Sequence, residues 1–263
     1  MYTLTMIDVL LNLKLLFFVV FFFIFFALEF FYNQRNTERK FSRLLFHGTF
    51  AIFNTIIMRI PSLFLLLPIL LITNENKFGL LNILNQNFLV ESILGFLLLD
   101  FSFYWFHRLN HVNNFLWRFH KVHHLDTQMD VTTSLRFHFV ELIISSLYKS
   151  VLILLFGIPI VLFIFYEILL SLSAQFHHSD IRLQDKADHY LSKIIVTPKY
   201  HTNHHTVALT SRNANYASIL TIWDYMFFSQ KEADPKDREY LGTQDREKQF
   251  GFITNLKEPF TDN

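Results

Sequence analysis

The sequence predicts an all-α integral membrane protein, built as a bundle of about five transmembrane helices with a histidine-rich helical cap on the cytoplasmic side. Two observations lead to this fold class. Of the 263 residues, 52% are hydrophobic and 33 are phenylalanine, and the apolar residues gather in five runs long enough to cross a bilayer. Twelve of the thirteen histidines lie between His107 and His205, most of them in tight clusters near the ends of these runs.

The five apolar runs predict the membrane helices in chain order. They cover residues 11–32, 44–73, 88–106, 140–156 and 159–176. No small-residue cleavage pattern follows the first run, so we expect it to be kept as a span and not removed as a signal peptide. The fourth and fifth runs form a hairpin, because Gly157 and Pro159 between them favour a helix break and a turn.

The second run is too long for one straight span, since thirty residues at about 1.5 Å each exceed a ~30 Å hydrocarbon core. It contains Arg59, Pro61 and Pro68. These residues leave two models open, one tilted helix kinked by proline and a tight hairpin broken at 59–61. We favour the single kinked helix, because a hairpin would place His107 on the side opposite to the basic loops.

The basic residues predict the orientation. The first loop carries Arg35, Arg39, Lys40 and Arg43, whereas the next loop, 74–87, has only Lys77. The positive-inside rule therefore places the first loop in the cytoplasm, and every histidine cluster then falls on the same cytoplasmic face.

The order of these features divides the chain into three parts. Residues 1–87 hold the N-terminal transmembrane helices, residues 88–229 form the catalytic domain with all the clusters, and residues 230–263 are a charge-rich polar tail.

Charge and cysteine content exclude several function classes. The net charge of +1 gives no reason to expect a nucleic-acid partner. The sequence contains no cysteine, which removes disulfides, zinc ribbons, iron–sulfur clusters and thiol nucleophiles.

The histidine clusters predict a metal site. Residues at positions i, i+3 and i+4 share one face of a helix, so each cluster directs two or three imidazoles to one point. The ligands that we expect from these clusters are His107, His111, His120, His123, His124, His201, His204 and His205. Neutral imidazoles suit iron, zinc, copper and nickel, and this number of them indicates more than one metal.

The remaining histidines have less regular spacing. His177 and His178 are neighbours, and neighbours on a helix point about 100° apart, so both can be ligands only of different metals; we include both and favour His178. His138 is expected to support a ligand. His47 and His189 lie outside the clusters and are expected to be structural.

Three carboxylates are candidates for the catalytic site, because a carboxylate can orient a ligating imidazole through its other ring nitrogen. Asp100 lies two helical turns before His107, inside a predicted span, where an acid is costly and by default functional. Glu141, like Asp126 and Asp180, lies close in sequence to a histidine cluster, and Asp224 follows Trp223 in the late segment.

Several segments together resemble a known family. Residues 100–111 (DFSFYWFHRLNH), 116–124 (LWRFHKVHH), 130–138 (DVTTSLRFH) and 197–205 (TPKYHTNHH), with Trp223 and Asp224, are similar to the motifs of the fatty acid hydroxylase/sterol desaturase superfamily of integral-membrane di-iron, histidine-box enzymes, especially a bacterial sterol desaturase-like branch. The family often has proline where this chain has Phe139, and glycine and threonine where it has Phe228 and Ser229.

The resemblance implies a function. It implies two iron ions that activate O2 and oxidise a C–H bond of a membrane lipid such as a sterol or fatty acyl chain, by hydroxylation or desaturation, with alkyl-ether monooxygenation as an alternative. No dinucleotide fingerprint is present, so an external electron donor, a separate electron-transfer protein or reductase, is implied.

Two alternatives come from other classes. A membrane metal transporter or metal-binding protein would place ligands along a path at mid-membrane, whereas these clusters lie at the ends of spans. A zinc hydrolase needs three ligands, an open position and a nearby glutamate base, but the sequence has no H-E-x-x-H motif and too many candidate ligands.

Overall fold

The computed structural model describes residues 2–244 and 251–261. Within these residues the regular elements are helices, and the only β contacts are three isolated bridges. The helices are α1 (Tyr2–Leu28), α2 (Lys40–Pro61), η1 (Ser62–Leu66), α3 (Leu67–Asn76), α4 (Leu80–Leu84), α5 (Phe88–Val112), α6 (Asn114–His124), η2 (Val131–Leu135), α7 (Phe139–Phe156), α8 (Ile160–His178), α9 (Asp185–Leu191), α10 (Pro198–His204), α11 (Leu209–Arg212), α12 (Ile222–Met226), η3 (Asp237–Glu239), α13 (Phe252–Lys257) and η5 (Glu258–Phe260). The prediction of an all-α fold is confirmed.

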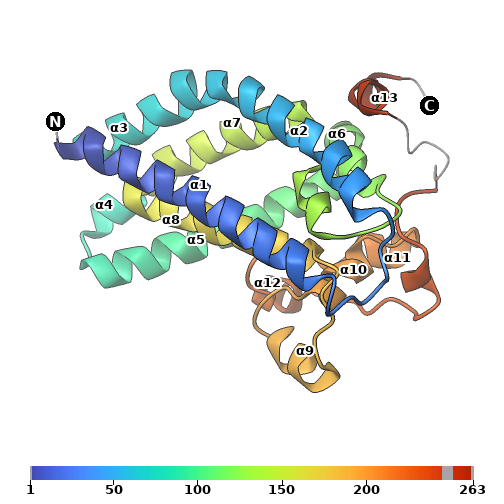
Figure 1. Cartoon of the computed structure of the whole chain (residues 1–263). Helices are drawn as coiled ribbons and strands as arrows, with labels where there is room; N and C mark the ends of the chain where they lie inside the picture. The colour runs from blue at the N-terminus through green and yellow to red at the C-terminus, as the bar shows by residue number, and fades with distance from the viewer. Residues whose placement is uncertain (1, 245–250, 262–263) are drawn as a thin grey trace.

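Five helical segments are long and apolar enough to cross a membrane, as the sequence predicts. They are 8–28, 40–84, 88–112, 139–156 and 160–178. In Figure 1 these long helices fill one half of the molecule, and the short helices α6 and α9–α12 gather at the other half as a cap. Many large apolar side chains on the long helices are exposed, for example Leu15 on α1 and Leu45 on α2, which is the surface expected of helices surrounded by lipid.

The second segment is one kinked helix and not a hairpin. Helix α2 continues through the π-helical η1 into α3 without a break, and the three form one arch in Figure 1. Pro61 ends α2 and Pro68 lies in the first turn of α3. A proline has no N–H and clashes with the carbonyl four residues before it, so the widened π-turn between the two prolines accommodates both.

The hairpin between α7 and α8 turns at Gly157, as predicted. Gly157 has φ +68°, and a Cβ added there would lie 2.2 Å from the carbonyl oxygen of Phe78. Gly79 lies directly opposite, and a Cβ on it would lie 2.1 Å from the Gly157 nitrogen. The backbones therefore touch at the end of the bundle away from the cap, which only glycine permits.

The core of the bundle lies between α5, α7 and α8. Leu99, Phe103, Ile153 and Tyr166 are buried there in one apolar cluster. Helix α1 lies along α8 over much of its length (Figure 1). This packing holds the C-terminal ends of α5 and α8 close together, where both helices carry histidines.

The C-terminal residues pack on the cap. Lys121 of α6 pairs with Glu258 at 2.7 Å, and Arg136 donates to the Asn255 side chain at 2.9 Å. The described part of the segment 251–261 is therefore attached to the helix that carries His120, His123 and His124.

Candidate metal centre

Nine histidines converge in two adjoining groups. In each group the candidate ligand atoms lie within 4.8 Å of one another. The first group is His107, His111, His120, His124 and His204, and the second is His123, His178, His201 and His205.

Helical spacing produces this convergence. His107 and His111 lie on one face at the C-terminal end of α5, and Asn113 then caps α6 by accepting from the N–H groups of Phe115 and Leu116. The chain therefore turns directly from one histidine-bearing helix into the next. On α10, Thr197 caps the helix and Pro198 occupies its first turn, which fixes the position of His201.

Several imidazoles are held by their Nδ1 atoms, so that Nε2 points into the centre. His107 Nδ1 lies 2.8 Å from the Tyr216 carbonyl oxygen, and His204 Nδ1 lies 2.7 Å from that of Ala214. A carbonyl oxygen only accepts, so both Nδ1 atoms carry the proton and both Nε2 atoms are lone-pair donors for a metal.

The second group contains a contact that a bound cation would stabilise. His123 Nδ1 donates to the Arg136 carbonyl at 3.2 Å, and His178 Nδ1 donates to the Ala174 carbonyl at 2.7 Å. Their Nε2 atoms are 3.0 Å apart. Neutral imidazoles with Nδ1 protonated have lone pairs at both Nε2 atoms, which repel at this distance unless a positive ion lies beside them. Nitrogens bound to one ion are separated by about this distance.

Burial keeps the imidazoles neutral. Removal from water lowers the pKa of His123, His124, His201, His204 and His205 well below the usual range. The neutral form is the one that binds a metal. His204 Nε2 and both ring nitrogens of His111 are buried without a hydrogen-bond partner among the described residues, so the donor set fits metal ions.

His177 belongs to neither group. It is buried, and its ring centroid lies 4.1 Å from that of His201. Its neighbour His178 is in the second group. The structure thus separates the two adjacent histidines, and metal binding by His177 remains a prediction.

Glu141 contacts a candidate ligand directly. Its Oε1 accepts from His120 Nδ1 at 2.8 Å, and both side chains are buried. The carboxylate therefore fixes the ring of His120 with Nε2 directed toward the first group, and it increases the basicity of that nitrogen.

Asp224 acts on the centre through the backbone. Its two oxygens accept from the N–H groups of Tyr216 and Ala217 at 2.8 and 2.9 Å. The Tyr216 carbonyl in turn accepts from His107. Asp224 also accepts from the Tyr200 hydroxyl at 3.0 Å, so it positions the turn that orients His107, a candidate ligand.

The hydrogen bonds of Asp100 join it to a turn and not to a histidine. Its Oδ2 accepts from the Leu220 N–H at 3.1 Å and from Trp223 Nε1 at 2.8 Å. Asp100 thus fastens α5 to the segment before α12. A catalytic role for it remains a prediction.

Two histidines outside the groups have structural contacts. His138 accepts from the Val140 N–H at the start of α7, and its Nε2 lies 3.1 Å from the Leu256 carbonyl. It caps a helix, so these contacts do not show the predicted support of a ligand. His47 lies 2.8 Å from the Thr132 hydroxyl and is buried.

Comparison with known proteins agrees with this geometry. The model of the fatty acid hydroxylase family matches residues 92–229, slightly more than half of the chain. The chain belongs to the fatty acid hydroxylase family. Its match includes every histidine of the two groups.

Curated relatives of this fatty acid hydroxylase family member include lipid-modifying enzymes. It is 28% identical to the ornithine lipid hydroxylase OlsE of Rhizobium tropici over 65% of the chain and 50% of that protein. It is 37% identical to the alkylglycerol monooxygenase of Danio rerio over 51% of the chain and 29% of that protein. The chain thus spans half or less of the length of these relatives. No solved structure matches it significantly.

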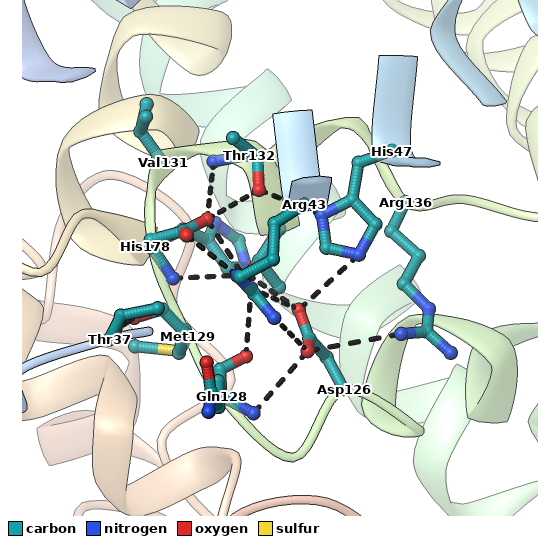
Figure 2. Close-up of polar contacts among 12 residues, drawn as sticks. Thr37, Arg43, His47, Asp126, Gln128, Met129, Val131, Thr132, Arg136 and His178 are labelled. Carbon is teal, nitrogen blue, oxygen red and sulfur yellow. Dashed lines mark hydrogen bonds and ion pairs between the residues drawn. The ribbon is translucent and has the colours of Figure 1, made fainter. Parts of the chain in front are cut away.

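An ion-pair network behind the histidines escaped sequence analysis. Arg43 forms a bidentate pair with Asp126, with both N–O distances 2.8 Å, and its Nε donates to Asp130 at 2.7 Å. Figure 2 shows Arg43 beside Asp126, with Arg136 also directed toward Asp126. Burial by itself raises the pKa of Asp126, but Arg43 more than offsets this and holds that pKa below its usual range. The network fixes the loop that follows His124.

A second pair ties the first loop to the end of α8. Lys40 pairs with Glu29 at 2.9 Å, and the Asp180 carboxylate accepts from the N–H groups of Arg35 and Thr37. In the sequence alone, Arg35, Lys40 and Arg43 are interpreted only as a positive-inside signal. Only the pairing of these side chains with acids distant in sequence reveals a second role, as in the 3.4 Å ion pair between Arg35 Nε and Asp180 and the 2.7 Å ion pair between Arg43 Nε and Asp130.

A cavity opens from the histidines into the bundle. Its volume is about 510 Å³, and it is lined at one end by His107, His120, His123 and His178. Further in, its walls are formed by α1, α7 and α8 and include Lys14, Lys149 and Glu167. A family member with this arrangement has space for a ligand beside its metal centre.

Proposed function

We propose that this protein is a membrane-bound di-iron oxygenase that uses O2 to hydroxylate or desaturate a C–H bond of a lipid. The observation that carries the proposal is the 3.0 Å contact between His123 Nε2 and His178 Nε2, with both Nδ1 atoms donating to carbonyl groups. A metal ion bound beside two facing lone pairs that are buried from water would stabilise them, and imidazole ligands suit iron.

Two groups of ligands support two ions. The first offers five imidazoles and the second four, and neither contains a carboxylate that would favour calcium or magnesium. Bound there, a pair of iron ions would supply the power to activate O2 and abstract hydrogen from an unreactive C–H bond. The protein's own contribution is to hold each Nε2 inward, through Glu141, Tyr216 and Ala214 among others.

The cavity supports a lipid substrate. It runs from the histidines between membrane helices, and Phe103, Phe106 and Leu170 contribute apolar surface to its walls. A chain that enters from the bilayer can therefore reach the metal centre without crossing water. Burial of every histidine of the second group also excludes solvent from the reacting bond.

The proposed reaction needs an electron donor. The sequence has six glycines and no G-x-G-x-x-G loop, so it offers no site for a nicotinamide or flavin of its own. We propose an external reductase or electron-transfer protein that docks on the cap, and we place the cap on the cytoplasmic side because the first loop carries four basic residues.

Two alternative functions compete with this proposal: an alkyl-ether monooxygenase of the same chemistry, and a metal transporter, which belongs to another class. The 37% identity to an alkylglycerol monooxygenase favours oxidation beside an ether oxygen. A metal transporter would need ligands along a path through the bilayer, whereas both groups lie at one end of α5 and α8.

The test is isotope transfer from oxygen. Protein loaded with iron, reduced by a chemical or protein donor and mixed with extracted membrane lipids is exposed to ¹⁸O2. Hydroxylation places one ¹⁸O atom in the lipid, desaturation gives a product two mass units lighter, and ether oxidation gives a lipid aldehyde. The zinc-loaded protein is the control. Absence of any lipid product with iron, or equal products with zinc, would refute the proposal.

A further inference from the structure

The cavity ends at a charged triad inside the membrane. Glu167 of α8 forms two ion pairs. One of its oxygens lies 2.9 Å from Lys14 Nζ of α1, and the other lies 2.8 Å from Lys149 Nζ of α7. All three residues line the cavity that begins at the histidines. We propose that this triad binds the anionic group of the substrate, so that the lipid oxidised here carries a carboxylate or phosphate; this inference rests on the proposed function.

The charge of the triad is not balanced. Two ammonium groups meet one carboxylate, which leaves one positive charge in the middle of the spans. An unpaired charge in a transmembrane region is costly and marks a functional site by default. An oxyanion bound beside the two lysines would complete the pairing.

The two lysines also have N–H donors beyond those directed at Glu167. Each ammonium group has three donors; Lys14 uses one of them in a hydrogen bond to Glu167, and Lys149 forms an ion pair with the other oxygen of that carboxylate. Within the described residues, the structure gives the nitrogens of Lys14 and Lys149 no second acceptor, although Lys149 lies over the Phe103 ring at 5.3 Å. The spare donors of two neighbouring ammonium groups suit an oxyanion with two or three oxygens.

Access to the triad is available from the lipid side. The Lys14 side chain is 36% exposed, whereas those of Lys149 and Glu167 are 16% and 13% exposed. Lys14 lies on α1, whose neighbouring Leu13 and Leu15 face outward. The triad therefore reaches from the cavity toward the bilayer, and a lipid can enter between α1 and its neighbours.

Helix geometry fixes the distance between the triad and the metal centre. Glu167 precedes His178 by eleven residues on α8, which is about 16 Å along the axis. Lys149 follows Glu141 by eight residues on α7, or about 12 Å. A chain anchored at the triad then presents one particular carbon to the histidines, so the position of oxidation is counted from the anionic end.

Binding can be measured without catalysis. The protein in nanodiscs of zwitterionic lipid is heated with palmitate, with the phosphate monoester of hexadecanol, or with hexadecanol itself. We expect the two anions to raise the unfolding temperature and hexadecanol to raise it less. Palmitate or the phosphate acting alone would identify which oxyanion the site prefers, in support of the proposal. Equal effects of all three compounds would overturn it.

Substitutions at the triad separate binding from structure. Lys14→Met and Lys149→Met should weaken binding of the effective anion by roughly tenfold or more, since each removes a cationic partner of that charge. Lys14→Arg keeps the charge at the partly exposed position and should keep the binding. Glu167→Gln removes the competing carboxylate and should keep or strengthen it. If Glu167→Gln abolishes anion binding as the lysine variants do, the triad only holds the helices together and the proposal is wrong.

These experiments distinguish failure of the anion site from failure of the proposed oxygenase function. Anion-specific stabilisation that depends on the lysines, together with no oxidised lipid, would support the site and count against the oxygenase. Oxidation of a lipid by a protein that shows no preference for the anionic compounds would leave the oxygenase standing and overturn this inference alone.

Discussion

Glu141 on α7 accepts a hydrogen bond from His120 Nδ1 on α6 at 2.8 Å, with both side chains buried. Helices α6 and α7 are joined by the fourteen residues 125–138, so the contact depends on the conformation of this connecting segment. The pair is the direct link between a carboxylate and the first histidine group, and it leads to the first prediction.

Substitution of Glu141 should weaken the first metal position. Loss of a carboxylate that orients a ligating imidazole typically costs ~10–100-fold in metal affinity or activity. We expect Glu141→Leu to show this loss in iron titrations. Glu141→Gln can still accept from His120 and should lie between Glu141→Leu and the unaltered protein. Equal iron affinity in all three proteins would show that Glu141 does not act on the site.

The two groups should lose metal independently. His111→Ala removes an imidazole from the first group and His205→Ala from the second. Each should lower metal content by about one ion per chain and abolish turnover. His189→Ala is the control, because His189 is exposed and outside both groups. Loss of both ions from either variant would indicate one cooperative site in place of two.

Arg43 should be essential to stability. Removing one partner of a buried ion pair costs about 3–5 kcal/mol, and Arg43 serves Asp126 and Asp130 together. Arg43→Met should lower the unfolding temperature in detergent strongly, and Arg43→Lys should restore little because lysine cannot form the bidentate pair. The exposed Arg118 gives the matched control, and Arg118→Met should change the unfolding temperature little.

The metal-free protein should be sensitive to acid. Burial lowers the pKa of His123, His201 and His205 in the folded chain, whereas their usual value is 6.5. As the pH falls through 6.5, the unfolded chain takes up protons that the folded chain does not, so the free energy of unfolding decreases. Thermal unfolding of chelator-treated protein between pH 7.5 and 5.5 should show a falling midpoint, and a rising midpoint would contradict the neutral buried cluster.

The sequence predicted the bundle and the histidine set because both depend on local patterns. Apolar runs show the spans, and the spacing of His120, His123 and His124 is legible without tertiary contacts. The proline-kinked second helix also followed from Pro61 and Pro68, and the structure confirms it.

The rest depends on contacts distant in sequence. Arg43 pairs with Asp126 across 83 residues, and Lys14 with Glu167 across 153. In the sequence these are ordinary charged residues near the ends or middle of apolar runs. His138, which the sequence predicts to support a ligand, caps α7 because it directly precedes Phe139. Asp100 accepts from the Trp223 indole because the turn at 220–223 folds back on α5. Both contacts lie outside the local patterns, and the predicted roles of the two residues stay predictions.

The central claim is that the two histidine groups hold two iron ions, and metal analysis of the purified protein tests it most directly. Protein expressed with added iron and purified in detergent without chelator should contain about two iron ions per chain, with Mössbauer spectra of a coupled pair. The double variant His111→Ala, His205→Ala, purified in parallel, should contain almost none. A folded, unaltered protein that retains no metal, or one tightly held zinc ion, would contradict the account.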